Sequence, residues 1–298
     1  MLGNRLLDAF AFEYKHLLEA ELRKLVDRLE APPIIKKAMH YSLEAGGKRI
    51  RPLLLFATIA AFGLDPKKGL LAASAVEMVH TYSLIHDDLP SMDDDDYRRG
   101  KLTNHKVFGE ATAILAGDAL LTYSFEVIGM IPNDAASSDA KLKLVTEFAK
   151  AAGAEGMVGG QVADMEGENK ELSLEELEYI HIHKTGKLLG FSVQAGAIIS
   201  GANEQQLEDL RGFAHHLGLA FQIQDDILDL VGNPELLGKP VGSDTSNHKC
   251  TYPQLLTMDG AKKALQHHID ESKHYLERTG LSTTLLLELT DLVASRDH

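Results

Sequence analysis

The chain has 298 residues, 44% of them hydrophobic, which is ample apolar material for a large core in one or two domains. Its net charge of −14 excludes the basic field that nucleic-acid binding needs, and an anionic ligand would require local capture by metal ions or basic side chains. A single cysteine excludes an internal disulfide and is typical of a reducing compartment.

The hydrophobic spacing predicts helices along the whole chain and no strand of useful length. Ser173 and Glu176 form a capping box, Asn203 and Asp259 are candidate N-caps, and Gly280 is a stop signal. In chain order the predicted helices cover 5–29, 34–44, 51–63, 67–89, 108–131, 138–165, 174–201, 204–231, 260–278 and 283–294.

No low-complexity linker or repeat divides the chain, so we expect one all-α domain over residues 1–298. The segments 67–89 and 188–231 are apolar nearly all round, which is typical of central helices. The longest apolar run, 53–64, is too short to span a bilayer, and no basic-then-apolar leader opens the chain. We therefore expect a cytoplasmic protein without a membrane span.

The stretch 80–101 carries the strongest chemical signal, because it contains six carboxylates followed by basic residues. Asp87 and Asp88 end a predicted apolar helix, where the negative pole of the helix dipole disfavours acids. Asp93 belongs to the acidic run that follows, and Arg98 comes two residues after the end of that run. Carboxylate oxygens suit Mg²⁺ and arginine forks suit phosphate. The pattern indicates a metal–diphosphate site, with a solvated acidic loop as the alternative.

A second acidic cluster lies near the end of the predicted helix 204–231. Asp225 and Asp229 are four residues apart and share a helix face, where like charges repel by about 0.2–0.5 kcal/mol. A single Asp-Asp-x-x-Asp is a weak signal, because exposed helix faces produce it often. Two such clusters at the ends of apolar helices predict helix ends that face each other across a cavity and hold cations between them.

A glycine pair precedes basic residues at Gly46-Gly47-Lys48, with Arg51 three residues further on. Glycine lets the backbone approach a ligand closely, and lysine and arginine offer phosphate a point charge and a fork. A helix C-cap followed by solvated basic side chains explains the same residues, and their pattern alone leaves both interpretations open.

Further candidates are weaker on their own. His80 lies two helical turns before Asp87, but a lone histidine on an apolar face is usually a core residue. Some glycines lie inside helical patterns. They occur in the segment 159–161, which is followed by Asp164, and two residues after Lys184. Each such glycine costs about 1 kcal/mol relative to alanine, and close helix packing explains it as well as a ligand does.

Together these residues resemble the short-chain trans-prenyl diphosphate synthases, most closely the bacterial farnesyl diphosphate synthases, from about residue 42 to residue 253. The family's first aspartate-rich motif is matched by Asp87, Asp88 and Asp93, and its second by Asp225, Asp226 and Asp229. Its Gly-Gly-Lys-x-x-Arg-Pro element is matched by Gly46, Gly47, Lys48, Arg51 and Pro52. Asp94 stands where relatives often have asparagine, at a position that is not expected to be a ligand.

The resemblance implies an all-α helical bundle of the isoprenoid synthase type with a central apolar cavity. It implies a transferase that joins isopentenyl diphosphate head to tail to dimethylallyl or geranyl diphosphate. Three Mg²⁺ ions, with Mn²⁺ as an alternative, and a homodimer are implied as well. Drawing negative charge toward the metals would ionise the allylic carbon–oxygen bond, and the departed diphosphate would accept the final proton.

The resemblance also implies site residues. The metal ligands are Asp87, Asp88, Asp93, Asp225 and Asp229. The allylic diphosphate is bound by Arg98, Lys184, Thr185, Gln222, Lys239 and Lys249, and the catalytic set is Asp87, Asp93, Arg98, Lys184, Thr185, Gln222, Asp225 and Lys239. Isopentenyl diphosphate is bound by Gly47, Lys48, Arg51, His80 and Arg99.

Product length is expected to depend on the residues beneath the first aspartates. On a helix, Ser83 lies one turn before Asp87 and Tyr82 lies on its flank. The family resembled uses an aromatic residue at the Tyr82 position, with a two-residue insertion around Pro90, to stop chains at fifteen carbons. We therefore predict farnesyl diphosphate as the product. The helical wheel does not centre Tyr82 on the pocket face, so geranylgeranyl diphosphate is the alternative.

Other classes fit less well. A terpene cyclase usually carries an Asn/Ser/Glu metal triad in place of the second aspartate motif, and it has no use for Lys48 and Arg51. A non-catalytic synthase subunit would be expected to lose one aspartate motif. A calcium-binding or scaffold protein would not need buried acids combined with Gly-Gly-Lys-x-x-Arg.

Overall fold

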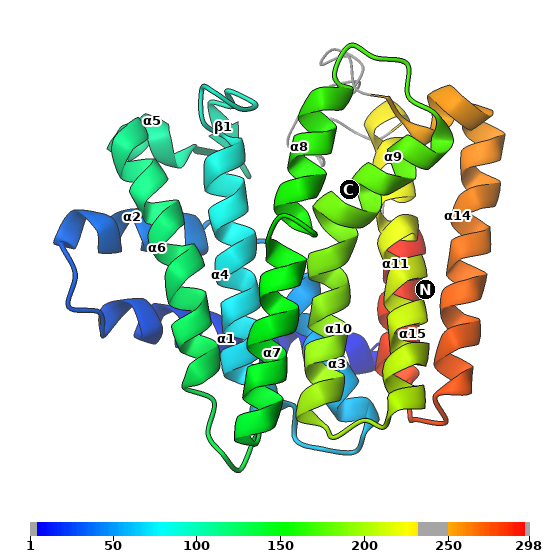
Figure 1. Ribbon diagram of the computed structural model, residues 1–298, viewed down its shortest axis with the longest axis horizontal. Helices are drawn as coiled ribbons and strands as arrows, with labels where there is room; N and C mark the ends of the chain where they lie inside the picture. The colour runs from blue at the N-terminus through cyan, green and yellow to red at the C-terminus, as the bar shows by residue number, and fades with distance from the viewer. Residues whose placement is uncertain (1–4, 232–249, 296–298) are drawn as a thin grey trace. The chain divides into compact units, whose positions relative to one another are not determined.

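The computed structural model describes residues 5–231 and 250–295, which are almost entirely helical (Figure 1). The predicted all-α class is therefore confirmed. The helices form two compact units. The first unit combines residues 1–56 with 65–145, and the second combines 57–64 with 146–298.

The first unit is built around α4 (Leu70–Asp87), whose apolar run is buried along most of its length. Ala72, Val76 and Val79 have no exposed surface, and α6 packs directly against this helix (Figure 1). The other elements of the unit are α1 (Arg5–Asp27), α2 (Pro33–Leu43), the first part of α3 (Ile50–Ala61), the 3₁₀ turn η1 (Pro66–Gly69), β1 (Tyr97–Arg98), β2 (Lys101–Leu102), α5 (Asn104–Phe108), α6 (Glu110–Gly129) and the first turns of α7 (Ser138–Ala152).

Among the described residues, α6 alone is long and apolar enough, by length and composition, to cross a membrane. Its Ala116, Leu120 and Val127 side chains have no exposed surface, because this face of α6 packs within the unit. A core helix of this kind meets the same criteria of length and composition.

The second unit is built around α11 (Glu204–Val231), which packs along α14 (Tyr252–Arg278) and α10 (Lys187–Ile199). Ile223 and Ile227 of α11 form a buried cluster with Leu177 and Tyr252. The remaining elements are the end of α3, the last turns of α7, α8 (Met157–Gly167), α9 (Leu174–Ile180), the π-helical turn η2 (His181–Gly186) and α15 (Thr284–Ser295).

Two predicted helix boundaries are wrong. The expected helix 138–165 is two helices, because the chain breaks at Gly156, where a Cβ atom would lie 2.1 Å from the carbonyl oxygen of Ala151. Asp259 is not the cap. α14 begins at Tyr252 but is kinked at Thr257, whose φ is 64°, and the Thr257 hydroxyl accepts from the Gly260 amide at 3.3 Å. Thr257 rather than Asp259 therefore caps the part of α14 that covers the predicted helix 260–278.

The other predicted caps are confirmed. The Ser173 hydroxyl accepts from the Glu176 backbone amide at 3.2 Å, and the Glu176 carboxylate accepts from the Ser173 amide at 2.8 Å. Asn203 Oδ1 accepts from the Gln206 amide at 2.8 Å. Gly280 follows α14 with a φ of 65°, a left-handed conformation that ends helices.

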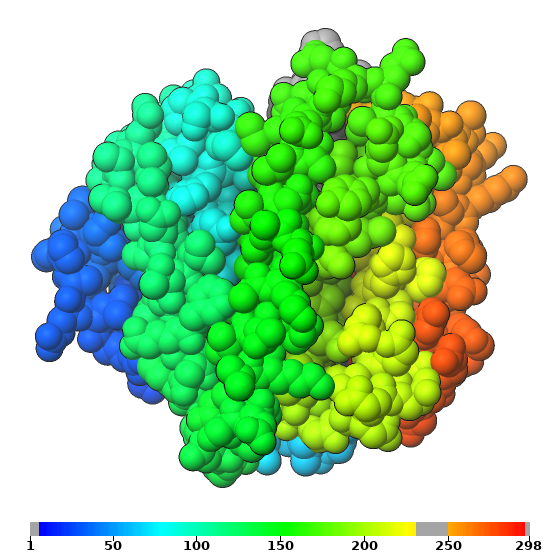
Figure 2. All heavy atoms as spheres, in the orientation of Figure 1, coloured from blue at the N-terminus to red at the C-terminus, as the bar shows by residue number. Residues whose placement is uncertain are grey.

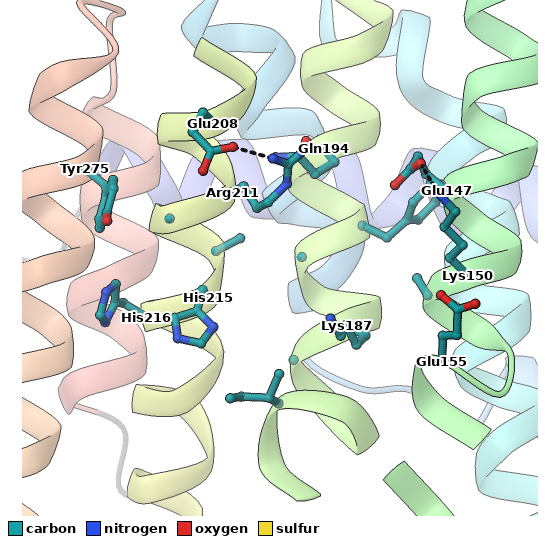
Figure 3. Close-up of a pocket in the computed structure, with 17 residues that line it drawn as sticks. Glu147, Lys150, Glu155, Lys187, Gln194, Glu208, Arg211, His215, His216 and Tyr275 are labelled. Carbon is teal, nitrogen blue, oxygen red and sulfur yellow. Dashed lines mark hydrogen bonds and ion pairs between the residues drawn. The ribbon is translucent and has the colours of Figure 1, made fainter. Parts of the chain in front are cut away.

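Histidines gather where α11 packs against α14. The Nδ1 atoms of His216 and His268 lie 2.9 Å apart, so one ring donates a proton that the other accepts. Figure 3 shows His216 and Tyr275 side by side, and their rings stack at a centroid distance of 5.6 Å. Burial, followed by the charges of His216 and His267, lowers the pKa of His268 to about 4. The folded protein therefore favours the neutral ring.

We predict an acid-sensitive helix packing at this histidine pair. A folded-state pKa of about 4, below the ordinary 6.5, means that stability is lost as pH falls through that interval, by at most about 1.4 kcal/mol per pH unit for one proton. His268→Asn should flatten the dependence of the unfolding free energy on pH between 7 and 4. Denaturant titrations at several pH values measure it. His16→Gln, on an exposed position of α1, is the control, and an unchanged slope in His268→Asn would contradict the prediction.

Candidate active site

A loop in the first unit carries the Gly-Gly-Lys motif in a left-handed turn. Gly46 and Gly47 have φ values of 84° and 135°, which side-chain-bearing residues rarely adopt. Arg99 Nη1 donates to the carbonyl oxygen of Gly46. A Cβ atom at Gly47 would lie 2.7 Å from that same nitrogen. Glycine is thus required at position 47 so that a guanidinium can lie against the loop, and two residues of the predicted isopentenyl diphosphate set come together.

The short hairpin β1–β2 directs two consecutive arginines to different partners. Its two turn residues, Arg99 and Gly100, both have positive φ, as a type I′ turn requires. Arg98, which ends β1, donates from Nε and Nη2 to Asp88 Oδ1 at 2.7 and 2.6 Å. Arg99 instead contacts the glycine loop. The hairpin, which the sequence did not predict, therefore connects the acidic motif with the glycine motif.

The first aspartate motif lies at the C-terminal end of α4, as predicted. Asp88 is buried at 3% exposure, and burial raises the pKa of its carboxyl group while the ion pair with Arg98 opposes that change. Asp87 is half-buried and Asp93 is exposed. The Asp93 amide donates to the Asp87 carbonyl at 2.8 Å, which brings the predicted ligands back to the helix end.

His80 lies in the electrostatic field of the basic cluster. Desolvation is the largest cause that lowers the pKa of its imidazole, and the positive charges of Arg51, Arg99, Arg49 and Arg98 lower it further. The ring is therefore neutral at pH 7 and can exchange hydrogen bonds without adding charge. Arg51 is half-buried, and Lys48, three residues earlier in the sequence, is exposed.

Tyr82 and Ser83 differ in what their side chains contact. Tyr82 is buried at 6% exposure, and its ring lies edge-on to His86, with 5.5 Å between centroids and 86° between planes. The half-buried Ser83 hydroxyl donates to the carbonyl oxygen of His80 in its own helix at 2.9 Å. Of the two residues, Tyr82 contributes the larger buried surface below the first motif.

The second unit brings the other predicted residues to one cavity of about 230 Å³. Lys184 donates to Asp164 Oδ2 there at 2.6 Å. Thr185 does not line this cavity, and Lys239 and Lys249 lie outside the described residues. The titratable and amide side chains that line the cavity are Asp164, Glu168, His181, Lys184, Gln222, Asp225, Asp226, Asp229 and Cys250.

Asp226 is anchored to the protein within this cavity. Its Oδ2 accepts from the Tyr252 amide at 2.9 Å and lies 3.2 Å from His181 Nε2. Asp225 is half-buried and Asp229 has 2% exposure. The sequence indicated Asp164 only together with its neighbouring glycines. It gave no indication of His181, because the position of this residue in its helix does not distinguish it from other helical residues.

A π-helical turn presents Lys184. The turn η2 widens the helix between α9 and α10, and α8 packs against it. A Cβ atom at Gly160 would lie 2.1 Å from the Lys184 backbone nitrogen. The glycine at position 160 therefore lets α8 touch the backbone of the turn and bring Asp164 to the lysine.

The donor chemistry of these acids suits a hard cation. Within residues 5–231 and 250–295, no group of three or more His, Cys, Asp or Glu side chains is arranged as a ligand set. Mg²⁺ typically takes only one or two carboxylates and completes its shell with water and substrate phosphates. Asp225 and Asp229, which line one cavity, fit that requirement, and so do Asp87 and Asp93, which are joined by a backbone hydrogen bond.

A separate hollow of about 470 Å³ in the second unit contains none of the predicted site residues. Figure 2 shows it between the end of α7 and α11, and Figure 3 shows Lys187, His215 and Tyr275 around it. Its acids and bases neutralise each other in part, since Arg211 pairs with Glu208 and Lys150 with Glu147 at 3.1 Å.

Comparison with known proteins identifies the family of the chain. The family model described as polyprenyl synthetase matches residues 32–279. The farnesyl diphosphate synthase of Geobacillus stearothermophilus is 59% identical over 98% of both chains, and that of Bacillus subtilis is 56% identical over 98% of this chain and 99% of its own. A geranyltransferase structure from Legionella pneumophila aligns with a TM-score of 0.84 at 33% identity, covering 98% of this chain and 96% of its own. The chain belongs to the polyprenyl synthetase family.

We predict that Gly160→Ala destabilises the second unit. The added methyl group would overlap the Lys184 backbone, and such overpacking costs about 1–3 kcal/mol. Gly129→Ala, at a helical position with nothing within 4 Å of the added atom, is the control and should be neutral or stabilising. Chemical denaturation of both variants measures the difference, and equal stability of the two would contradict the prediction.

Proposed function

We propose that the protein is a prenyltransferase that condenses isopentenyl diphosphate with dimethylallyl diphosphate and then with geranyl diphosphate, and releases farnesyl diphosphate. The proposal rests on the basic cluster of the first unit, which consists of the four arginines around His80: Arg49, Arg51, Arg98 and Arg99. There Arg99 lies against the Gly46–Gly47 loop, and the charges of four arginines act on His80. A cluster of this kind captures a diphosphate in a chain whose net charge of −14 would otherwise repel it.

Isopentenyl diphosphate is assigned to this cluster. Arg51 and Arg99 supply forks that match phosphate oxygens, Lys48 supplies a point charge, and the backbone at Gly47 permits close approach. The neutral His80 imidazole supplies a hydrogen bond. Holding the diphosphate at this end fixes the position of the double bond that attacks the allylic partner.

The allylic diphosphate is assigned to the acidic motifs and their basic neighbours. Asp87, Asp88 and Asp93, with Asp225 and Asp229, would hold Mg²⁺, for which we propose three ions, or Mn²⁺. When bound, these ions supply Lewis acidity that weakens the allylic carbon–oxygen bond. The protein side chains that would bind the same diphosphate or face the cation are Arg98, Lys184, Thr185, Gln222, Lys239 and Lys249.

The acids also bind their own neighbours. Asp88 holds the Arg98 guanidinium, and Asp164 holds the Lys184 ammonium, so both cations are oriented before they meet a phosphate. Because the two cationic side chains are already oriented, they do not need to reorganise during the reaction, and this lowers the barrier. The side chains named here include no general base for the last proton, and the departed diphosphate is its acceptor.

We further propose that the enzyme is a cytoplasmic homodimer with one polyprenyl synthase domain over residues 1–298. Ile114 and Leu115 on α6 are 41% and 56% exposed, and an adjacent apolar pair of this kind suits coverage by a second copy. The acidic net charge supports the proposal that nucleic acid is not among the partners of the protein.

Product analysis tests the proposed reaction. Purified protein incubated with Mg²⁺, dimethylallyl diphosphate and isopentenyl diphosphate should give a fifteen-carbon alcohol after phosphatase treatment, identified by gas chromatography and mass spectrometry. A twenty-carbon alcohol would instead indicate a geranylgeranyl diphosphate synthase. A cyclic hydrocarbon, or no product at all, would refute the proposal.

Asp225→Asn should lower kcat by about a hundredfold or more, because one positioned electrostatic group is lost from the reacting diphosphate. The amide keeps the shape of the side chain, so thermal unfolding should change little. Glu208→Gln on the same helix is the matched control, since Glu208 is exposed and pairs only locally with Arg211. Steady-state rates in excess Mg²⁺ measure both variants, and equal rates would exclude Asp225 from the machinery.

Tyr82→Ala should lengthen the product beyond fifteen carbons. Removal of the buried ring opens space beside His86 below the first aspartates, into which a longer chain can extend. Chromatographic sizing of the products measures the change. Ser83→Ala, which removes only a hydroxyl bound to its own helix, is the control. A variant that still stops at fifteen carbons would show that Tyr82 does not limit the chain.

A further inference from the structure

We infer that the buried ion pair between Arg49 and Glu77 positions the isopentenyl diphosphate loop, so that both are positioning residues for that substrate. The inference rests on the proposed function. Arg49 occupies the first of the two positions that the Gly-Gly-Lys-x-x-Arg-Pro element leaves unspecified, and Glu77 lies on α4 one turn before His80. Neither residue belongs to the sets that bind substrate or metal.

Arg49 contacts four helices of the first unit. Its guanidinium contacts α4, the end of α2 and α1, where Nη2 lies 3.7 Å from Glu19 Oε1, and its backbone carbonyl contacts α3. Its Nη1 lies 2.5 Å from Glu77 Oε1 on α4, and its Nη2 donates to the carbonyl oxygen of Leu43 at 2.7 Å. Leu43 ends α2, and the Arg49 carbonyl accepts the amide of Leu53 at 3.0 Å at the start of α3. The loop between α2 and α3 is therefore held to α4 through one side chain.

The backbone at Arg49 is in a conformation that requires support. Its φ is 55°, in the left-handed region that a residue with a side chain rarely adopts. Lys48 precedes it and Arg51 follows two residues later, so relaxation of this φ toward negative values would redirect both. The buried contact with Glu77 opposes that relaxation.

The pair is poorly built for stability alone. Arg49 and Glu77 are 4% and 2% exposed, yet Arg49 Nε and Glu77 Oε2 have no hydrogen-bond partner in the described part of the chain. A buried ion pair with unsatisfied atoms recovers little of its desolvation cost, and apolar residues of similar size often stabilise a fold better. The Arg49–Glu77 pair is therefore explained by its role in placing the loop and not by a contribution to stability.

Glu77 also influences the second arginine of the site. Desolvation lowers the pKa of the Arg99 guanidinium, and the Glu77 carboxylate is the strongest influence in the opposite direction. Arg99 in turn lies against Gly46 and Gly47 of the same loop. One buried carboxylate thus acts on both sides of the loop, on Arg49 within it and on Arg99 across it.

The test separates the two substrates. Glu77→Gln should raise KM for isopentenyl diphosphate about ten- to a hundredfold, because displacing a positioned group by an ångström has effects of that size. KM for geranyl diphosphate should stay within about twofold, as for a change confined to one subsite. Arg49→Lys, which keeps the charge but loses the fork, should change the two constants in the same way and carries the test if Glu77→Gln does not fold.

Asp209→Asn is the matched control for lost stability. Asp209 is a carboxylate of 1% exposure that pairs with Arg278 at 2.8 Å in the second unit. This variant should lower Tm and leave both KM values unchanged. Equal increases in both KM values for Glu77→Gln, or a lower Tm with both constants unchanged, would overturn the inference.

Two measurements distinguish failure of the positioning role from failure of the proposed function: product formation by the wild-type protein, and calorimetric titration of isopentenyl diphosphate alone into the wild type and Glu77→Gln. If the wild-type protein forms no prenyl product, the proposed function fails. If the wild type forms product and Glu77→Gln binds isopentenyl diphosphate as tightly as the wild type does, only the positioning role fails.

Discussion

Acidic side chains crowd the C-terminal ends of two apolar helices, α4 and α11, where the helix dipole already concentrates negative charge. Each motif resolves part of that repulsion inside the protein. Asp88 is buried against Arg98, and Asp226 is buried against His181 and the Tyr252 amide. Their neighbours Asp87 and Asp225 are only half-buried. One aspartate of each pair is therefore fixed by contacts within the protein, and the other is the more exposed of the two.

The positive charges of the site are brought together in a different way. Two short connections contain residues with a left-handed backbone conformation. Gly46, Gly47 and Arg49 adopt it in the loop after α2, and Arg99 adopts it in the hairpin turn. Tight turns of this kind bring guanidinium groups and backbone close together without a long basic helix. Burial lowers the pKa of His80 most, and the field of the neighbouring arginines lowers it further. The site therefore gains a neutral hydrogen-bonding ring without further charge repulsion among cations.

Two buried ion pairs hold side chains of the first unit in place. Arg49 and Glu77 leave Nε and Oε2 without partners in the described chain, and Asp88 Oδ1 accepts from two nitrogens of Arg98. Such arrangements contribute little net stability, and they hold side chains in fixed directions. The stability of both units comes from apolar helices, as the fully buried Val76 and Ile223 illustrate.

Much of the fold could be predicted because helix signals are local. The caps at Ser173 and Asn203, the stop at Gly280 and the ends of α4 and α11 follow from side chains a few residues apart. The break at Gly156 and the kink of α14 at Thr257 could not be predicted in this way. An apolar period continues through a glycine, and Thr257 and Asp259 are both suitable N-cap residues by type, so only the backbone conformation decides between them.

The amino-acid sequence by itself determined the helical class, the family and the chemical types at the site, because these depend on composition, spacing and order. Only the tertiary structure decided which residues meet. It pairs Arg98 with Asp88, Lys184 with Asp164 and Arg49 with Glu77, and it sends Arg99 to the glycine loop. The reason is physical: partners 10 to 53 residues apart in sequence meet through packing and turn geometry, which no local pattern encodes.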